Sequence, residues 1–158
     1  MRRLLADLLL EKAKKNPDIY VLTGDLGYKL WDDFTVYCPS QYLNCGAAEQ
    51  AMLDIAVGLA YEGKIPFVYS ITPFLLYRGF ETVRTYINYE KLNIKLLGSG
   101  RNHDYAHDGI SHWSDDAGLV LASVPNIKSY WPKKKEEIPG ILKEMLEVKG
   151  PCFISLKR

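Results

Sequence analysis

Apolar residues along the chain show two different spacings. Six short segments of four to eight residues are rich in apolar side chains and are bounded by glycine, proline or polar residues. Short apolar runs between turn residues predict buried strands. These segments are IYVLTG (19–24), YLNC (42–45), IPFVYS (65–70), NIKLLGSG (93–100), NIKSYW (126–131) and PCFISL (151–156).

The segments between the predicted strands repeat apolar residues every three to four positions, which is the spacing of one helix face. In the first of them, Leu4, Leu5, Leu8 and Leu9 share such a face. Pro139 is expected in the first turn of the last one, where a proline is tolerated. The predicted helices are 2–15, 48–62, 74–88, 115–122 and 134–148, with one short helix before Pro39.

Strands that alternate with helices through short connections predict a parallel sheet. We therefore expect an α/β fold in one domain, residues 1–158, with a doubly wound, mostly parallel six-stranded sheet and helices on both faces. In such sheets, ligands bind beyond the carboxyl ends of the strands, where the strand order switches. The residues after the predicted strands include the carboxylates of Asp25 and Glu49, an aromatic cluster starting at Phe74, and all three histidines. This clustering is the main functional signal.

Composition narrows the classes of function. The 20 lysine and arginine residues nearly balance 19 aspartate and glutamate residues, so nothing indicates binding to nucleic acid or to an anionic membrane. Asp7 and Glu11 interrupt the N-terminal apolar stretch, and no segment reaches the roughly 18 apolar residues of a membrane span. Cys38, Cys45 and Cys152 have neither ligand nor redox spacing. This cysteine usage favours the cytoplasm.

Each candidate residue also has a purely structural interpretation. Glu49 stands in the first turn of a predicted helix, where an acid stabilises the helix dipole by about 0.3–1 kcal/mol. Phe74, Tyr77 and Phe80 have helical spacing, which is typical of core residues. The charged residues of the same helix are typical of a solvated face. They are Arg78, Glu81 and Arg84.

The loop RNHDYAHDGISHW (101–113) carries three histidines, and the spacing of His103 and His107 allows a metal site. No regular element holds the three imidazoles on one side, so a metal ion is not the preferred interpretation. The glycines of GSGRN (98–102) match neither the dinucleotide fingerprint nor the P-loop pattern. We expect them to permit a turn or the close approach of a ligand.

Several segments, each weak alone, form a specific ordered set. They are TGDLG (23–27), NCGAAEQAMLDIAVGLAYEGKIPF (44–67), TPFLLYRGFETVR (72–84), NIKLLGSG (93–100), HDGISHW (107–113) and GPCFISLKR (150–158). In order and spacing, this set resembles the pyrimidine-binding domain of transketolases over nearly the whole chain. The resemblance implies the thiamine diphosphate-binding fold.

Transketolases bind thiamine diphosphate between two domains, one of which grips the diphosphate through a divalent metal while the other holds the aminopyrimidine. The resemblance implies that this chain is the second domain. It lacks a Gly-Asp-Gly metal segment and ends where a third domain usually begins. We therefore expect a split enzyme, in which a partner subunit carries the diphosphate-binding domain with Mg²⁺ or Ca²⁺. Two copies of each chain would form a heterotetramer, because such sites lie between subunits.

Glu49 falls where the family keeps the glutamate that hydrogen-bonds the 1′ nitrogen of the aminopyrimidine, so the resemblance implies that it activates the cofactor. His112 falls on a residue that contacts substrate hydroxyls, and a histidine there can move protons to a developing enolate oxygen. The resemblance also implies cofactor contacts for residues in the loops after the first and third strands. They are Asp25, Leu26, Ile71, Phe74 and Tyr77.

The resemblance implies a substrate contact for Asp108, and Arg158 aligns with an arginine that grips a sugar phosphate. Four positions depart from the family pattern. Lys29 replaces a small hydroxyl residue, Gly100 replaces a histidine, and His103 and His107 are additional histidines in the substrate region. These changes keep a small ketose sugar as the expected substrate but question the usual sugar-phosphate specificity.

The expected activity is the transfer of a two-carbon ketol unit from a ketose, phosphorylated or not, to an aldehyde. The same cofactor also serves 2-oxo acid decarboxylases and deoxyxylulose-phosphate-synthase-like condensations, and His112 after Asp108 favours ketol chemistry over both. A non-catalytic scaffold or regulatory homologue is a third alternative, against which the intact Glu49 argues. A metal-dependent hydrolase built on the histidine loop is the fourth.

Overall fold

The computed structural model describes residues 1–158 and contains one six-stranded sheet. All neighbouring strands are parallel, in the order β2-β1-β3-β4-β6-β5. Each strand lies within or overlaps a segment predicted from its apolar residues, so the predicted α/β architecture is confirmed. The strands are β1 (Ile19–Thr23), β2 (Tyr42–Asn44), β3 (Ile65–Ile71), β4 (Lys95–Ser99), β5 (Lys128–Tyr130) and β6 (Cys152–Leu156).

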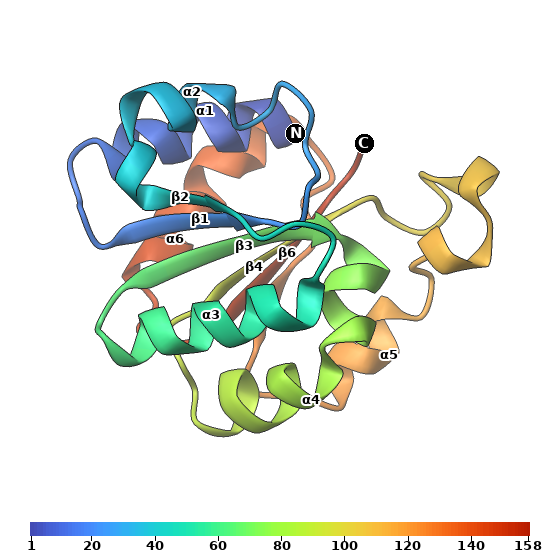
Figure 1. Ribbon diagram of the computed structural model, residues 1–158. Coiled ribbons are helices and arrows are strands. Elements are labelled where there is room, and N and C mark those ends of the chain that lie inside the picture. The colour runs from blue at the N-terminus through green and yellow to red at the C-terminus, as the bar shows by residue number, and fades with distance from the viewer.

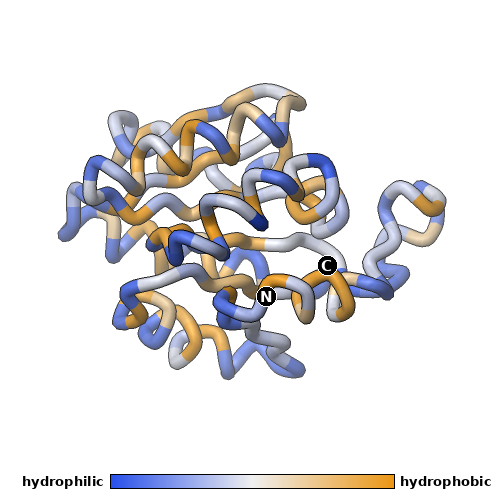
Figure 2. Tube along the Cα trace, turned by 90° about the horizontal axis from the view of Figure 1, so that it is seen from below, coloured by the Kyte–Doolittle hydropathy of each residue, from blue (hydrophilic) through white to orange (hydrophobic).

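Helices cover both faces of the sheet (Figure 1). Neighbouring residues of a strand point to opposite faces, so Val21 belongs to one buried apolar cluster and Leu22 to the other. In Figure 2, hydrophobic residues alternate with hydrophilic ones along each helix, as expected for helices with one face on the sheet. The first cluster includes α1 (Arg2–Ala13), α2 (Asp32–Tyr37) and α6 (Ile138–Glu147), and the second includes α3 (Glu49–Tyr61), α4 (Phe80–Thr82) and α5 (Ala117–Ala122).

The helix predicted for residues 74–88 differs from a regular α-helix. Two π-helical segments, Phe74–Arg78 and Val83–Tyr89, flank the single turn of α4. The backbone leaves helical geometry at Gly79, which has φ −109° and ψ 31°. Short π-helical turns are frequent at functional sites, so the first of these segments, Phe74–Arg78, is a candidate functional region.

Close packing against α3 explains the break at Gly79. A β-carbon at this position would lie 2.3 Å from Cδ1 of Leu53, so only glycine lets the two helices approach this closely. One turn further on, the Gln50 amide donates a hydrogen bond to Thr82 Oγ1 (2.7 Å), and the Thr82 hydroxyl donates one to Asp54 (2.7 Å). These contacts fix the position of the residues next to Gly79 relative to the first turn of α3.

The strand order reverses between β1 and β3, because β1 continues to β2 on one side and β3 continues to β4 on the other. A crevice for ligands is expected beyond the carboxyl ends of these two strands. The long loop between β4 and α5 projects from this same edge of the sheet, in yellow and orange at the right of Figure 1. None of the helices is both long and apolar enough to cross a membrane.

Candidate active site

Glu49 is the first residue of α3, and its side chain is only 2% exposed. The chain turns into this helix at Gly46, which has φ +70°. One carboxylate oxygen accepts a hydrogen bond from the Ser70 hydroxyl at the end of β3 (3.3 Å). A β-carbon at Gly24, directly after β1, would lie 3.4 Å from the same oxygen. The carboxylate is therefore buried at the reversal point between β1 and β3, unlike an ordinary solvated first-turn acid.

Arg78 is the charged partner of Glu49. Its Nη1 atom donates a hydrogen bond to Glu49 Oε2 at 2.8 Å. The guanidinium carbon also lies 3.6 Å from the centroid of the Phe74 ring, which is stacking distance for a planar cation. Sequence reasoning placed Arg78 on a solvated face and missed this contact. The sequence did contain one indication of the contact with Phe74. Arg78 follows Phe74 by four residues, which puts the two side chains on one side of the helix.

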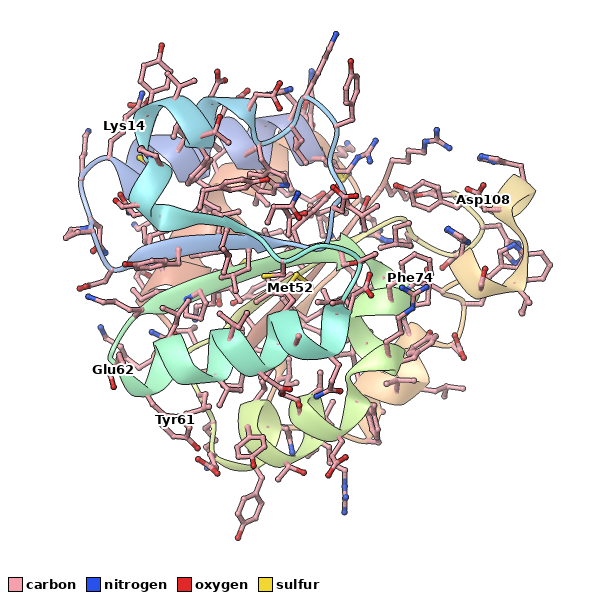
Figure 3. The ribbon with its side chains drawn as sticks, in the orientation of Figure 1. Lys14, Met52, Tyr61, Glu62, Phe74 and Asp108 are labelled. Carbon is pink, nitrogen blue, oxygen red and sulfur yellow. The ribbon has the colours of Figure 1, made fainter.

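His112 also contacts the Phe74 ring. Its imidazole meets Phe74 edge to face, with ring centroids 4.7 Å apart and an interplanar angle of 65°. The same imidazole lies 6.1 Å from the ring of Tyr105 and its Nδ1 atom is 2.9 Å from the Ser111 hydroxyl. In Figure 3, Phe74 lies at the edge of the sheet from which the long loop projects. The structure thus brings Glu49, Phe74 and His112 into one site.

A basic cavity of about 380 Å³ lies beside this site. It is lined by the start of α1, the loop after β1, the ends of β3 and β4, and the last residue of the chain. No aspartate or glutamate lines it, whereas three arginines do, which makes it suitable for an anionic group. The arginines are Arg2, Arg3 and Arg158, and Leu26 and Ile71 add apolar walls.

Tyr105 connects this basic cavity to the Glu49 site, and sequence reasoning missed it. Its hydroxyl is 3.2 Å from Arg2 Nη1 and 3.0 Å from Ser99 Oγ, and the Arg158 guanidinium lies 5.0 Å from its ring centroid. Arg2 was missed as well, because two arginines before an apolar helix carry no functional pattern. Of the residues expected to bind substrate, only Arg158 lies in this cavity.

The remaining predicted cofactor residues lie in different surroundings. Asp25, which has φ +58°, accepts a hydrogen bond from the Asn44 amide (3.2 Å) and is exposed. It lines a shallower pocket together with Lys29. Tyr77 donates its hydroxyl to Asp116 (2.5 Å), and burial together with this carboxylate raises the pKa of Tyr77. The expected roles of Asp25, Lys29 and Tyr77 stay predictions.

Asp108 and all three histidines lie on the projecting loop. His103 Nε2 is 2.7 Å from Asp115, and His107 Nε2 is 3.2 Å from Asp108. Figure 3 shows Asp108 on the part of the loop that stands away from the sheet. No three histidine, cysteine, aspartate or glutamate side chains come together in a metal-holding group. The substrate contacts expected for His103 and Asp108 stay predictions.

The similarity to known proteins extends over the whole chain. Residues 1–158 match the family described as the pyrimidine binding domain of transketolase. The chain is 31% identical over 159 residues to a 6-deoxy-6-sulfo-D-fructose transketolase subunit of Clostridium sp., covering 100% of this chain and 49% of that protein. It is 30% identical over 158 residues to an apulose-4-phosphate transketolase subunit of Phocaeicola vulgatus, covering 99% and 51%.

A solved structure described as a split gene transketolase, inactive beta4 tetramer, superposes with a TM-score of 0.87. It is 32% identical in sequence, and the match covers 99% of this chain and 50% of that one. The chain spans about half the length of the curated relatives it matches. Its parallel sheet, the buried acid at the reversal point and these similarities agree with the resemblance read from the sequence. The chain belongs to the transketolase pyrimidine-binding domain family.

Proposed function

We propose that this chain is the pyrimidine-domain subunit of a split, thiamine diphosphate-dependent transketolase-like enzyme. Such an enzyme transfers a two-carbon ketol unit from a ketose to an aldehyde. The observation that carries the proposal is the burial of Glu49 at the reversal point of the sheet. The guanidinium of Arg78 contacts both the Glu49 carboxylate and the face of the Phe74 ring. A buried carboxylate beside an aromatic ring in a ligand crevice is a candidate for proton transfer.

The residues at this edge of the sheet fit an aminopyrimidine. Glu49 offers a carboxylate whose charged partner, Arg78, is 48% exposed and therefore exchangeable. Phe74 offers a ring face on which a planar group can stack at the position now held by the Arg78 guanidinium. Leu26 and Ile71 supply apolar walls nearby, and the roles proposed for Tyr77 and Asp25 would complete the pocket. The divalent metal, Mg²⁺ or Ca²⁺, is assigned to residues of the partner subunit.

Thiamine diphosphate, when bound, would supply the nucleophilic carbon that adds to the carbonyl carbon of the ketose. Within this chain, Glu49 would share a proton with the 1′ nitrogen of the pyrimidine ring, and its buried position would keep water from competing for that proton. Phe74 would orient the ring by stacking. His112, whose imidazole contacts Phe74 and lies near Tyr105 of the basic cavity, would deliver a proton to the substrate oxygen that gains negative charge.

The basic cavity supports a ketose that carries an anionic group at the end remote from its carbonyl. Arg2 contacts the hydroxyl of Tyr105 and Arg158 lies over its ring, and guanidinium groups are well suited to bind phosphate or sulfonate oxygens. Two relatives are described by anionic sugars, a sulfo-fructose and an apulose 4-phosphate. Asp108, His103 and Lys29 would add polar contacts once the projecting loop is covered by a partner.

The proposed partner is a subunit that carries the diphosphate-binding domain. The relatives are described as subunits, and a structural neighbour as a split gene transketolase. We propose a heterotetramer with two copies of each chain, because a site built between different subunits requires both. The inactive tetramer described for the neighbour fits a chain that assembles but needs its partner for activity.

The test is to co-express the chain with the proposed diphosphate-binding partner subunit and to compare ketol transfer by wild type and Glu49→Gln. We expect the substitution to lower kcat by about 100- to 10,000-fold, the usual contribution of a proton-transferring group. Glu62→Gln is the matched control, because Glu62 ends the same helix and is exposed. Assembly of both variants should be unchanged by size-exclusion chromatography. Full activity of Glu49→Gln would disprove the assigned mechanism.

A further inference from the structure

Both oxygens of the Glu49 carboxylate are engaged. Oε1 accepts a hydrogen bond from Ser70 Oγ at 3.3 Å, and Oε2 accepts one from Arg78 Nη1 at 2.8 Å. The side chain is 2% exposed, so water has almost no access to either oxygen. A ring nitrogen can therefore approach this carboxylate only if one of the two partners leaves.

Arg78 is the partner that can leave. The Ser70 hydroxyl belongs to a fully buried residue at the end of β3. In contrast, the Arg78 side chain is 48% exposed, and its hydrogen bond to Glu49 is the only one it makes. The backbone beside it is fixed, because Gly79 packs against Leu53 of α3. Only a rotation of the Arg78 side chain toward solvent is needed to free Oε2.

The guanidinium occupies the place that a planar heterocycle needs. It is a flat, delocalised cation that stacks on the Phe74 ring at 3.6 Å and donates an N–H to Glu49. A protonated or hydrogen-sharing ring nitrogen needs the same two contacts, an aromatic face and this carboxylate. The two groups cannot both lie between Phe74 and Glu49.

We propose that Arg78 is an internal ligand of the cofactor site, which neutralises Glu49 in the free chain and is displaced when the aminopyrimidine binds. This inference rests on the proposed function. Arg78 is not among the residues that line the basic cavity. The benefit to the free chain is that its buried carboxylate is never left without a counter-charge, which would be costly. The consequence is that the cofactor binds in competition with Arg78.

The free chain provides the first test, by urea unfolding at neutral pH. Arg78→Met keeps an apolar stem over Phe74 but removes the charge, and we expect it to raise the ratio of unfolded to folded protein about tenfold. In the double variant with Glu49→Gln this loss should largely disappear, because no buried charge remains. Arg84→Met is the matched control, since Arg84 is exposed on the second π-helical segment and forms no ion pair. A loss that Glu49→Gln does not reverse would overturn the pairing.

The assembled pair provides the second test. Calorimetric titration of thiamine diphosphate with Mg²⁺ should show a dissociation constant about tenfold lower for Arg78→Met than for wild type, because the competing side chain is gone. Arg84→Met should bind like wild type. An unchanged or higher dissociation constant in a pair that binds the cofactor overturns this inference alone. A wild-type pair that binds no thiamine diphosphate overturns the proposed function together with it.

Discussion

The ring of Tyr105 lies so close over Gly100 that a β-carbon at position 100 would come within 2.4 Å of it. Gly100 also has φ +82°, a conformation that residues with a β-carbon rarely adopt. From this position the Tyr105 hydroxyl reaches Arg2 and Ser99. Gly100 therefore makes room for a tyrosine that reaches the basic cavity from the projecting loop.

Gly100→Ala should destabilise the chain by about 2–4 kcal/mol, because it combines backbone strain with overpacking against Tyr105. Urea unfolding monitored by circular dichroism measures this change. Gly118→Ala is the control, since Gly118 lies in α5 and a β-carbon there would meet no atom within 4 Å. Adding Tyr105→Ala to Gly100→Ala should recover the packing part of the loss. Equal stability of both single alanine variants would contradict the packing argument.

Arg2→Met should raise the KM for an anionic ketose about 10- to 100-fold while changing kcat little, because a charge-assisted hydrogen bond contributes about 1.5–3 kcal/mol to binding. The measurement is initial-rate kinetics of the assembled enzyme at low salt. Lys12→Met, which removes a cation from the exposed face at the other end of α1, should leave the KM unchanged. An uncharged ketose such as erythrulose should not distinguish wild type from Arg2→Met, and an equal effect on both sugars would refute the anion site.

Local sequence pattern was sufficient to predict the sheet, most of its helices and the edge where the candidate site lies. Strands such as β1 and β3 are buried on both faces, so their apolar runs stand out, and Glu49 follows β2, the strand next to β1. The helix over residues 74–88 was predicted at the right position, but its π-helical geometry was not predicted. Its break at Gly79 depends on the side chain of Leu53, which a periodicity argument does not include.

Long-range polar contacts could not be predicted in the same way. Arg78 pairs with Glu49 across 29 residues, and Arg2 reaches Ser99 across 97. Neither arginine differs locally from an ordinary solvated one, because its partner is brought near only by the sheet order. A pattern of apolar residues specifies where strands lie, whereas the partner of a charged side chain depends on which loops meet at one edge.

Lys95 is buried in β4, where its ammonium donates hydrogen bonds to the carbonyls of Val148 (2.9 Å) and Gly150 (2.7 Å), just after α6. Burial lowers the pKa of Lys95. Lys95→Met should cost about 2–4 kcal/mol of unfolding free energy, because two carbonyls lose their donor in the interior. Lys143→Met on the exposed face of α6 should change the unfolding free energy by less than about 0.5 kcal/mol. Comparable urea midpoints for the two variants would refute this role.

The hydroxyl of Tyr130 at the end of β5 is buried without a hydrogen-bond partner. Burial is the main cause that raises its pKa from 10 to about 12. The folded state therefore keeps this proton between pH 10 and 12 while the unfolded state loses it, so the stability that Tyr130 contributes is complete below pH 10 and falls as the pH rises toward 12.

Tyr130→Phe should leave the unfolding free energy at pH 7 unchanged or raise it by up to about 1 kcal/mol, because an unsatisfied polar group is removed without loss of packing. Above pH 10 the variant should lose stability less steeply than wild type, which urea unfolding at a series of pH values measures. Tyr89→Phe alters an exposed ring and should follow the wild-type curve. A Tyr130→Phe variant that is clearly less stable at pH 7 would mean that the hydroxyl has a partner after all.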